Sequence, residues 1–96
     1  MNDRYIFAVY DYALDQYEPK CAWPKDNFER YCYAKWAVDE ILRYLMDRKD
    51  THPIVVIEDF VSKMNAYSFA NRKFSLMFSI ARDIAEDILD MFRAME

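Results

Sequence analysis

Carboxylates near the end of the chain are the residues whose types and spacing most suggest chemistry. Four of them fall within the stretch FSIARDIAEDILDMF: Asp83, Glu86, Asp87 and Asp90. Carboxylates that converge on one point can hold Mg²⁺ or act as general acids and bases. On a helix, however, they lie opposite Ile84, Ile88 and Met91, on the side that an amphipathic helix turns to water. This spacing therefore favours a solvated helix face.

Two acidic motifs give the nearest resemblance to an enzyme. The residues concerned are Glu86, Asp87 and Asp90 of EDILD, and Asp39 and Glu40 of DEILR. They resemble the motifs with which all-α nucleoside-triphosphate pyrophosphatases of the MazG type hold magnesium on neighbouring helices. The resemblance implies a Mg²⁺-dependent hydrolase as the alternative function. It is confined to these short motifs, and the second departs from the pattern because Arg43 stands where another carboxylate is expected.

The sequence lacks the residue combinations that other kinds of catalytic site require. The chain has two cysteines, Cys21 and Cys32, and a single histidine, His52. These form neither a disulfide framework nor a zinc site, and both cysteines are expected to be reduced and buried or half-buried. Without glycine the chain has no phosphate-binding loop. We predict no catalytic residues, no metal and no cofactor, and we interpret His52, just before a proline, as a surface or capping residue.

The elements that position these residues are predicted to be helices. Tight hairpin turns favour glycine, and this chain has none. Three prolines, Pro19, Pro24 and Pro53, separate the segments. The prediction is an all-α, single-domain bundle of residues 1–96. Its helices are expected at about 26–49, 53–68 and 72–95, with a further N-terminal helix at about 3–17.

Helix ends and faces can also be predicted. Asp26 and Glu29 have capping-box spacing, and Thr51 is the expected cap of the helix that Pro53 opens. In the first helix the expected inward residues are Ile6, Val9, Tyr10, Ala13, Leu14 and Tyr17. Residues 5–12 and 54–57 could instead be short strands, because periodicity does not separate the two over so few residues.

Charge limits the partners. The net charge is −4, and no segment carries the basic excess that nucleic acid or anionic lipid requires. The chain lacks an apolar run long enough to span a bilayer, and its start does not resemble a signal peptide. We therefore expect a cytoplasmic protein that binds neither nucleic acid nor membrane.

The last predicted helix has an apolar stripe wider than a small bundle needs. The candidate interface residues on it are Met77, Ala81, Ile84, Ile88, Met91 and Met95. Tyrosines and tryptophans of the first half form a second candidate surface. Whether the stripe is intramolecular core or a dimer seam is left open by the sequence. The predicted function is a small, non-enzymatic interaction or regulatory module of a microbe or phage, which binds another protein and forms a homo-oligomer.

The order of charges along this helix supports a contact outside it. Arg72 and Lys73 lie at its predicted N-terminus and Asp87 and Asp90 toward its C-terminus, the reverse of the order that the helix dipole favours. Two arrangements would compensate. Basic residues at 43–49 could lie near the acidic end within the chain, or two copies of the helix could pack antiparallel across a two-fold axis.

Overall fold

The described part of the protein is helical, and the two described connections between helices are short. The computed structural model describes residues 3–17 and 28–96, with side chains at 3–14 and 28–96. The elements are α1 (Asp3–Tyr17), α2 (Phe28–Asp47), α3 (Pro53–Ala70) and α4 (Ser75–Ala94). The predicted all-α fold is confirmed, and both ambiguous segments, 5–12 and 54–57, are helical.

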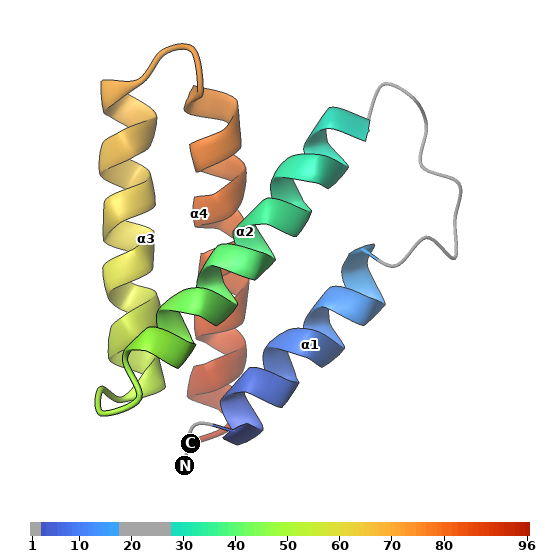
Figure 1. Ribbon diagram of the computed structural model, residues 1–96, viewed down its shortest axis with the longest axis vertical. Coiled ribbons are helices and arrows are strands. Elements are labelled where there is room, and N and C mark those ends of the chain that lie inside the picture. The colour runs from blue at the N-terminus through green and yellow to red at the C-terminus, as the bar shows by residue number, and fades with distance from the viewer. Residues whose placement is uncertain (1–2, 18–27) are drawn as a thin grey trace.

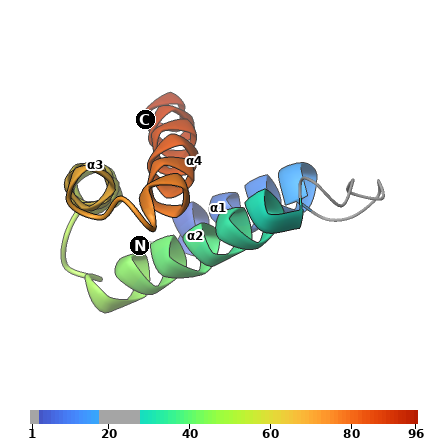
Figure 2. The ribbon, with the colours of Figure 1, turned by 90° about the horizontal axis from the view of Figure 1, so that it is seen from above.

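The helices form two packed pairs. α3 and α4 are antiparallel neighbours and share the most extensive interface, while α2 lies across α4 with α1 antiparallel beside it (Figures 1 and 2). α1 begins next to the end of α4, so the two chain ends lie together at one end of the molecule. The turn between α3 and α4 lies at the opposite end (Figure 1).

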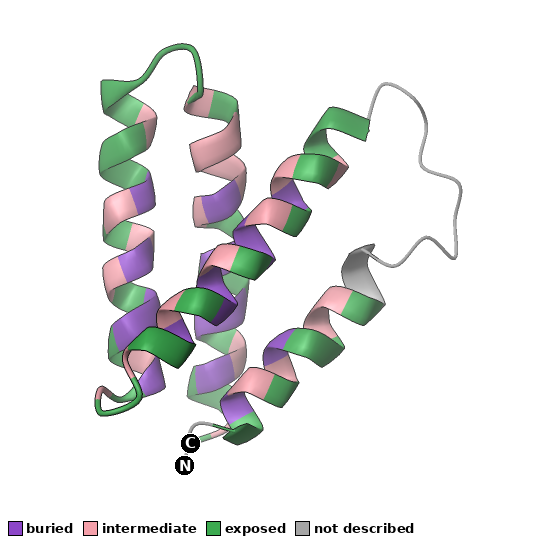
Figure 3. Ribbon diagram, in the orientation of Figure 1, coloured by how far each residue is buried: buried purple, intermediate pink, exposed green. Residues whose placement is uncertain are grey.

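The core is concentrated where α2 crosses the α3–α4 pair. The largest fully buried side chains are Phe60, Phe92, Ile41, Leu45, Ile57, Ile88, Val9 and Val56. They come from all four helices and form one cluster. Figure 3 shows buried positions of α3 and α4 from the end near the start of α1 to beyond the middle of both helices, and the last of them toward the turn are Met64 and Ala81. The turns of both helices that lie nearest to their connection are exposed or intermediate. Burial of each large apolar side chain contributes about 1.5–3 kcal/mol, so this crossing holds the fold together.

The helix caps correct part of the sequence interpretation. His52, not Thr51, caps α3, and its Nδ1 accepts the backbone N–H of Ile54 at 3.2 Å. The interpretation of His52 as a surface or capping residue is thus confirmed, and Pro53 occupies the first turn as expected. The histidine fills the role because its ring nitrogen reaches the free N–H groups of the first turn. Asp26 of the predicted capping box lies outside the described residues.

The turn between α3 and α4 is longer than expected. α4 begins at Ser75 rather than at residue 72, and residues 71–74 form a hydrogen-bonded turn in which Phe74 N donates to Asn71 O at 3.2 Å. Arg72 and Lys73 therefore precede the helix. Cations are disfavoured in the first helical turn, where the backbone N–H groups are partly positive, and this is consistent with the later start.

The buried face of α1 is rotated from the predicted one. Tyr5 and Val9 are buried, but Tyr10 and Leu14, which were predicted to point inward, are 47% and 53% exposed. Apolar residues extend around most of α1, so periodicity alone places its inner face poorly. Contacts with α4 decide it: Tyr5 packs edge-on against Phe92, with ring centroids 4.9 Å apart.

Truncation of a core side chain should test this burial pattern. We expect Phe60→Ala to lower the free energy of unfolding by about 3–5 kcal/mol, because the side chain is fully buried and its loss leaves a cavity. The matched control is Phe28→Ala, at a position that is 61% exposed, which should change stability by about 0.5 kcal/mol or less. Urea unfolding measures both. Equal losses would contradict the described core.

Candidate interaction surfaces

The four carboxylates of α4 lie on its outer face. Asp83, Glu86, Asp87 and Asp90 are all exposed, as the helical spacing predicted. Asp83 is paired with Arg82 at 3.2 Å, and Asp87 accepts a hydrogen bond from the Tyr12 hydroxyl at 3.1 Å. The row thus makes local polar contacts at the surface, including one that ties α1 to α4.

The two acidic motifs of the hydrolase alternative do not converge. Glu40 of α2 pairs with Arg43, its neighbour one turn on, and Asp39 lines a pocket between α1 and α2. Within the part of the chain that the structure describes, no three carboxylate, histidine or cysteine side chains are grouped so that they could hold a metal ion. The geometry gives this alternative no support.

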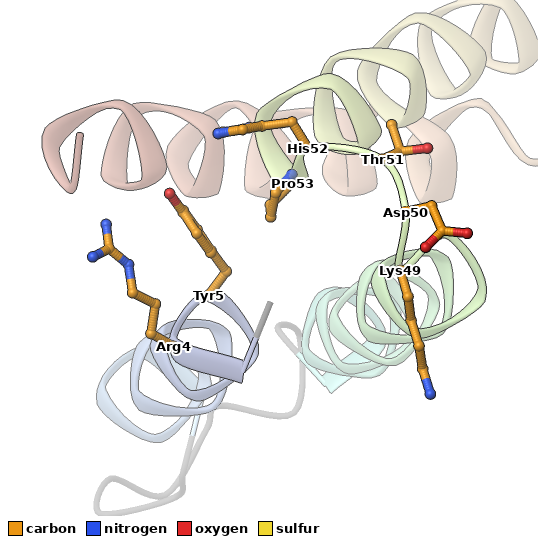
Figure 4. Close-up of a pocket in the computed structure, with 7 residues that line it drawn as sticks. All are labelled: Arg4, Tyr5, Lys49, Asp50, Thr51, His52 and Pro53. Carbon is orange, nitrogen blue, oxygen red and sulfur yellow. The ribbon is translucent and has the colours of Figure 1, made fainter. Parts of the chain in front are cut away.

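One pocket lies where α1 meets the turn before α3. It is an open pocket of about 540 Å³. Its lining residues are Arg4, Tyr5, Lys49, Asp50, Thr51, His52 and Pro53. Figure 4 shows Tyr5 directed toward the His52 side of the pocket, whereas Lys49 and Asp50 point away from both. Lys49 and Asp50 therefore lie apart from the polar groups on the Tyr5 and His52 side of the pocket.

Polar contacts at this pocket join three segments of the chain through Glu96. The Tyr5 hydroxyl donates to Glu96 Oε1 at 2.9 Å, and His52 Nε2 lies 2.9 Å from the same oxygen. Since Nδ1 of His52 accepts from Ile54, the hydrogen-bond network assigns the proton of the neutral ring to Nε2, facing Glu96. Arg4 also donates to the carbonyl of Met95 at 2.8 Å. We call these four side chains, Arg4, Tyr5, His52 and Glu96, the polar latch.

In the structure, some residues of the predicted C-terminal interface stripe are buried and others are partly exposed. Ala81, Ile84 and Ile88 are buried by the chain's own helices, at 0%, 5% and 0% exposure. Met91 and Met95 are partly buried against the same core, and Met77 is intermediate. The inner part of the stripe is therefore intramolecular core, and only its methionines offer surface to another molecule. Self-association stays a prediction.

Two of the basic residues at 43–49 pair with carboxylates outside α4. Arg48 pairs with Asp59 of α3 at 2.7 Å, and Arg43 pairs with Glu40 of its own helix. Asp59 also contacts Lys63 at 3.3 Å. The internal arrangement considered for Asp87 and Asp90 therefore does not involve Arg43 or Arg48. Arg93, near the end of α4, reaches Glu58 of α3 at 3.4 Å.

An apolar surface occupies the end of the α3–α4 pair. None of residues 65–80, all of them described, is buried. The exposed large apolar side chains are Tyr67, Phe69, Phe74 and Leu76, and Phe69 is 83% exposed. The ring of Phe78 packs against the rings of Tyr67 and of Trp36 on α2. Its centroid lies 5.4 Å from that of Tyr67 and 6.1 Å from that of Trp36. We call these four exposed residues, together with Arg72 and Lys73, the tip surface.

The tip surface is basic within an acidic protein. Residues 60–82 contain four cations, Lys63, Arg72, Lys73 and Arg82, and no carboxylate, although the whole chain has a net charge of −4. Arg72 and Lys73 are exposed beside the aromatic residues, and Lys73 lies 5.6 Å from the centre of the Phe74 ring. Charge and apolar area therefore coincide at this end of the molecule.

A second apolar surface lies on the outer face of α1. Phe7, Tyr10 and Leu14 are 65%, 47% and 53% exposed, at a spacing that places them on one side of the helix. Asp3 and Asp11 are exposed on the same side. We call these five residues the α1 face.

The α1 face borders an apolar pocket between α1 and α2. The pocket measures about 220 Å³, and its lining includes Tyr10 and Leu14 on α1 and Tyr31 and Val38 on α2. Tyr10 was part of the second surface that aromatic composition indicated, whereas Phe7 and Leu14 were not identified as surface residues. Tyr17 and Trp23 of that surface lie outside the described side chains.

Comparison of the chain with protein families, curated proteins and solved structures finds no match. None of the described helices has the length and apolar character needed to cross a membrane. The two exposed apolar surfaces therefore have to be interpreted from their own chemistry.

The polar latch gives a prediction about how α1 is held. We expect Tyr5→Phe to lower the free energy of unfolding by about 0.5–1.5 kcal/mol, because the substitution removes the hydrogen bond to Glu96 and retains the ring that packs on Phe92. Tyr10→Phe, on the exposed side of the same helix, is the control and should be nearly neutral. Thermal unfolding of both variants makes the comparison. No difference between them would show that the latch does not stabilise α1.

The ion pair of Asp59 gives a prediction about stability at low pH. The hydrogen bond from Arg48 lowers the pKa of Asp59 below its ordinary value of 3.8, with partial burial opposing the shift. Because the folded-state pKa is the lower one, the stabilisation is complete above pH 3.8 and is lost as the pH falls through the folded-state value. Asp59→Asn should therefore lower the free energy of unfolding at neutral pH. The expected loss is less than about 1 kcal/mol, because the ion pair is exposed. The difference in stability between the variant and wild type should shrink in acid. If the loss of stability caused by Asp59→Asn were the same at every pH, the stabilising role of the Asp59 carboxylate would be contradicted.

Proposed function

We propose that this protein is a non-catalytic interaction module that binds an acidic, apolar segment of a protein through its tip surface. One observation carries the proposal: exposed aromatic side chains and cations occur together at one end of the molecule. Phe69 is 83% exposed, and Arg72 and Lys73 stand in a stretch of 23 residues, 60–82, that has no carboxylate.

Burial of this surface would supply binding energy. Each large apolar side chain that passes from water into an interface contributes about 1.5–3 kcal/mol, and Phe69, Phe74, Tyr67 and Leu76 are all available for such burial. Aromatic residues ringed by polar groups are typical of interface centres. The cations would select an acidic partner and speed its approach more than they would add affinity.

The polar groups elsewhere favour binding over catalysis. At the pocket beside His52, Tyr5, His52 and Glu96 bind one another, and Arg4 donates to a main-chain carbonyl. Cys32 is an exposed free thiol, so the prediction that it is buried or half-buried is wrong. We include a cytoplasmic setting in the proposal, since a reducing compartment keeps such thiols reduced.

A peptide series tests the proposed function. Three synthetic amphipathic helices would share one leucine stripe and differ only in glutamate, glutamine or lysine at the flanking positions. We expect the glutamate peptide to bind most tightly, about tenfold tighter than the lysine peptide at low salt, with the difference shrinking as salt is added. Fluorescence anisotropy of labelled peptides measures the affinities.

Two variants locate the binding. Phe69→Ser should abolish most of the affinity for the glutamate peptide, whereas Val55→Ser, an exposed apolar position on α3 at 51%, should leave it unchanged. Circular dichroism would establish that both variants fold. If no peptide binds, or if Phe69→Ser binds as well as wild type, the tip surface is not a binding site.

A further inference from the structure

We propose that the acidic, apolar segment is the α1 face of a second copy of this chain. The inference rests on the proposed function and names the partner for the same site. It follows from a match between two exposed surfaces of one molecule: the tip surface is apolar and basic, and the α1 face is apolar and acidic.

The apolar parts are a protruding side chain and a pocket. Phe69 is the most exposed of the large apolar side chains described, and it stands at the last turn of α3. Beside the α1 face lies the pocket of about 220 Å³ between α1 and α2, lined in part by Tyr10, Leu14 and Val38. Its lining also includes one cation, Lys35, and one carboxylate, Asp39, whose charges offset each other. In the proposed contact, Phe69 of one copy inserts between α1 and α2 of the other.

The charges match in sign. Arg72 and Lys73 flank Phe69 and Phe74 on the tip surface, and among the described residues neither cation forms an ion pair with a carboxylate. On the α1 face, Asp11 is exposed between the apolar positions. A contact between the two surfaces would bring opposite charges to the rim of a buried apolar centre, the usual composition of a protein interface.

The placement of the surfaces favours a closed pair. The tip surface lies at the end of the molecule opposite to the start of α1 (Figure 1). Two copies packed antiparallel would therefore set each tip surface against the α1 face of the other, so both contacts form at once across a two-fold axis. This mode differs from the antiparallel pairing of C-terminal helices considered from the sequence, because Ala81, Ile84 and Ile88 are already buried within the chain.

Charge reversal tests the pairing. The wild-type chain should be a dimer at micromolar concentration by size exclusion with light scattering. Arg72→Glu with Lys73→Glu, or separately Asp11→Lys, should each raise the dimer dissociation constant about tenfold or more at low salt. An equimolar mixture of the two variants should restore the dimer, because the reversed tip of one variant then meets the reversed α1 face of the other, and the second contact keeps the wild-type charges on both sides. Glu86→Lys, which makes the same charge change on the outer face of α4, is the control and should leave the dimer intact.

The outcomes separate this inference from the proposed function. A monomeric wild type that still binds the glutamate peptide overturns the second copy as partner and leaves the proposed function standing. A dimer that is insensitive to both reversals, a mixture that fails to reassociate, or assemblies that grow beyond the dimer also overturn the inference. Circular dichroism of each variant establishes that any loss of association occurs in a folded chain.

Discussion

The crossing of α2 over the α3–α4 pair is the constraint on which the rest of the molecule depends. Phe60, Phe92, Ile41 and Leu45 are fully buried there, and together they supply the main apolar contribution to stability. Since α2 lies obliquely, it covers only part of α4 (Figures 1 and 2). The core therefore ends at Met64 on α3 and Ala81 on α4, and beyond these residues the α3–α4 pair ends in apolar side chains that no described element covers.

The two ends of the molecule consequently differ in chemistry. At the end where the chain termini meet, carboxylates and hydrogen-bond donors from different helices bind one another, as in the latch around Glu96 and in the pair of Arg48 with Asp59. Each such contact at the surface contributes little free energy. The latch joins the start of α1 to the end of α4, beside the packing of Tyr5 against Phe92. In this arrangement Tyr5 and Val9 point inward, and Phe7 and Leu14 face water. Apolar residues of α1 thus remain available for a partner.

Much of this fold could be predicted from the sequence, and the limits have physical causes. The lack of glycine and the spacing of apolar residues were sufficient to predict four helices. Periodicity identifies a stripe but not the element that covers it, so Ile84 and Ile88 of the predicted interface stripe are core residues instead. The cap of α3 was missed because histidine is an uncommon cap, and its role depends on ring geometry. The tip surface could have been predicted from the sequence, because its aromatic residues lie in a long stretch that has no carboxylate.

Exposed apolar area is the feature that the described polar contacts of this molecule do not explain. Catalysis needs polar groups that are held ready and unsatisfied where a substrate will bind, whereas the polar groups of the pocket beside His52 are engaged with one another or point apart. Binding needs the opposite arrangement, in which exposed apolar side chains lose contact with water and nearby charges set the orientation. The tip surface and the α1 face both have this composition, with opposite charge. In the proposed pairing each molecule would carry both halves of the contact, so the concentration of the chain would control whether these surfaces are covered.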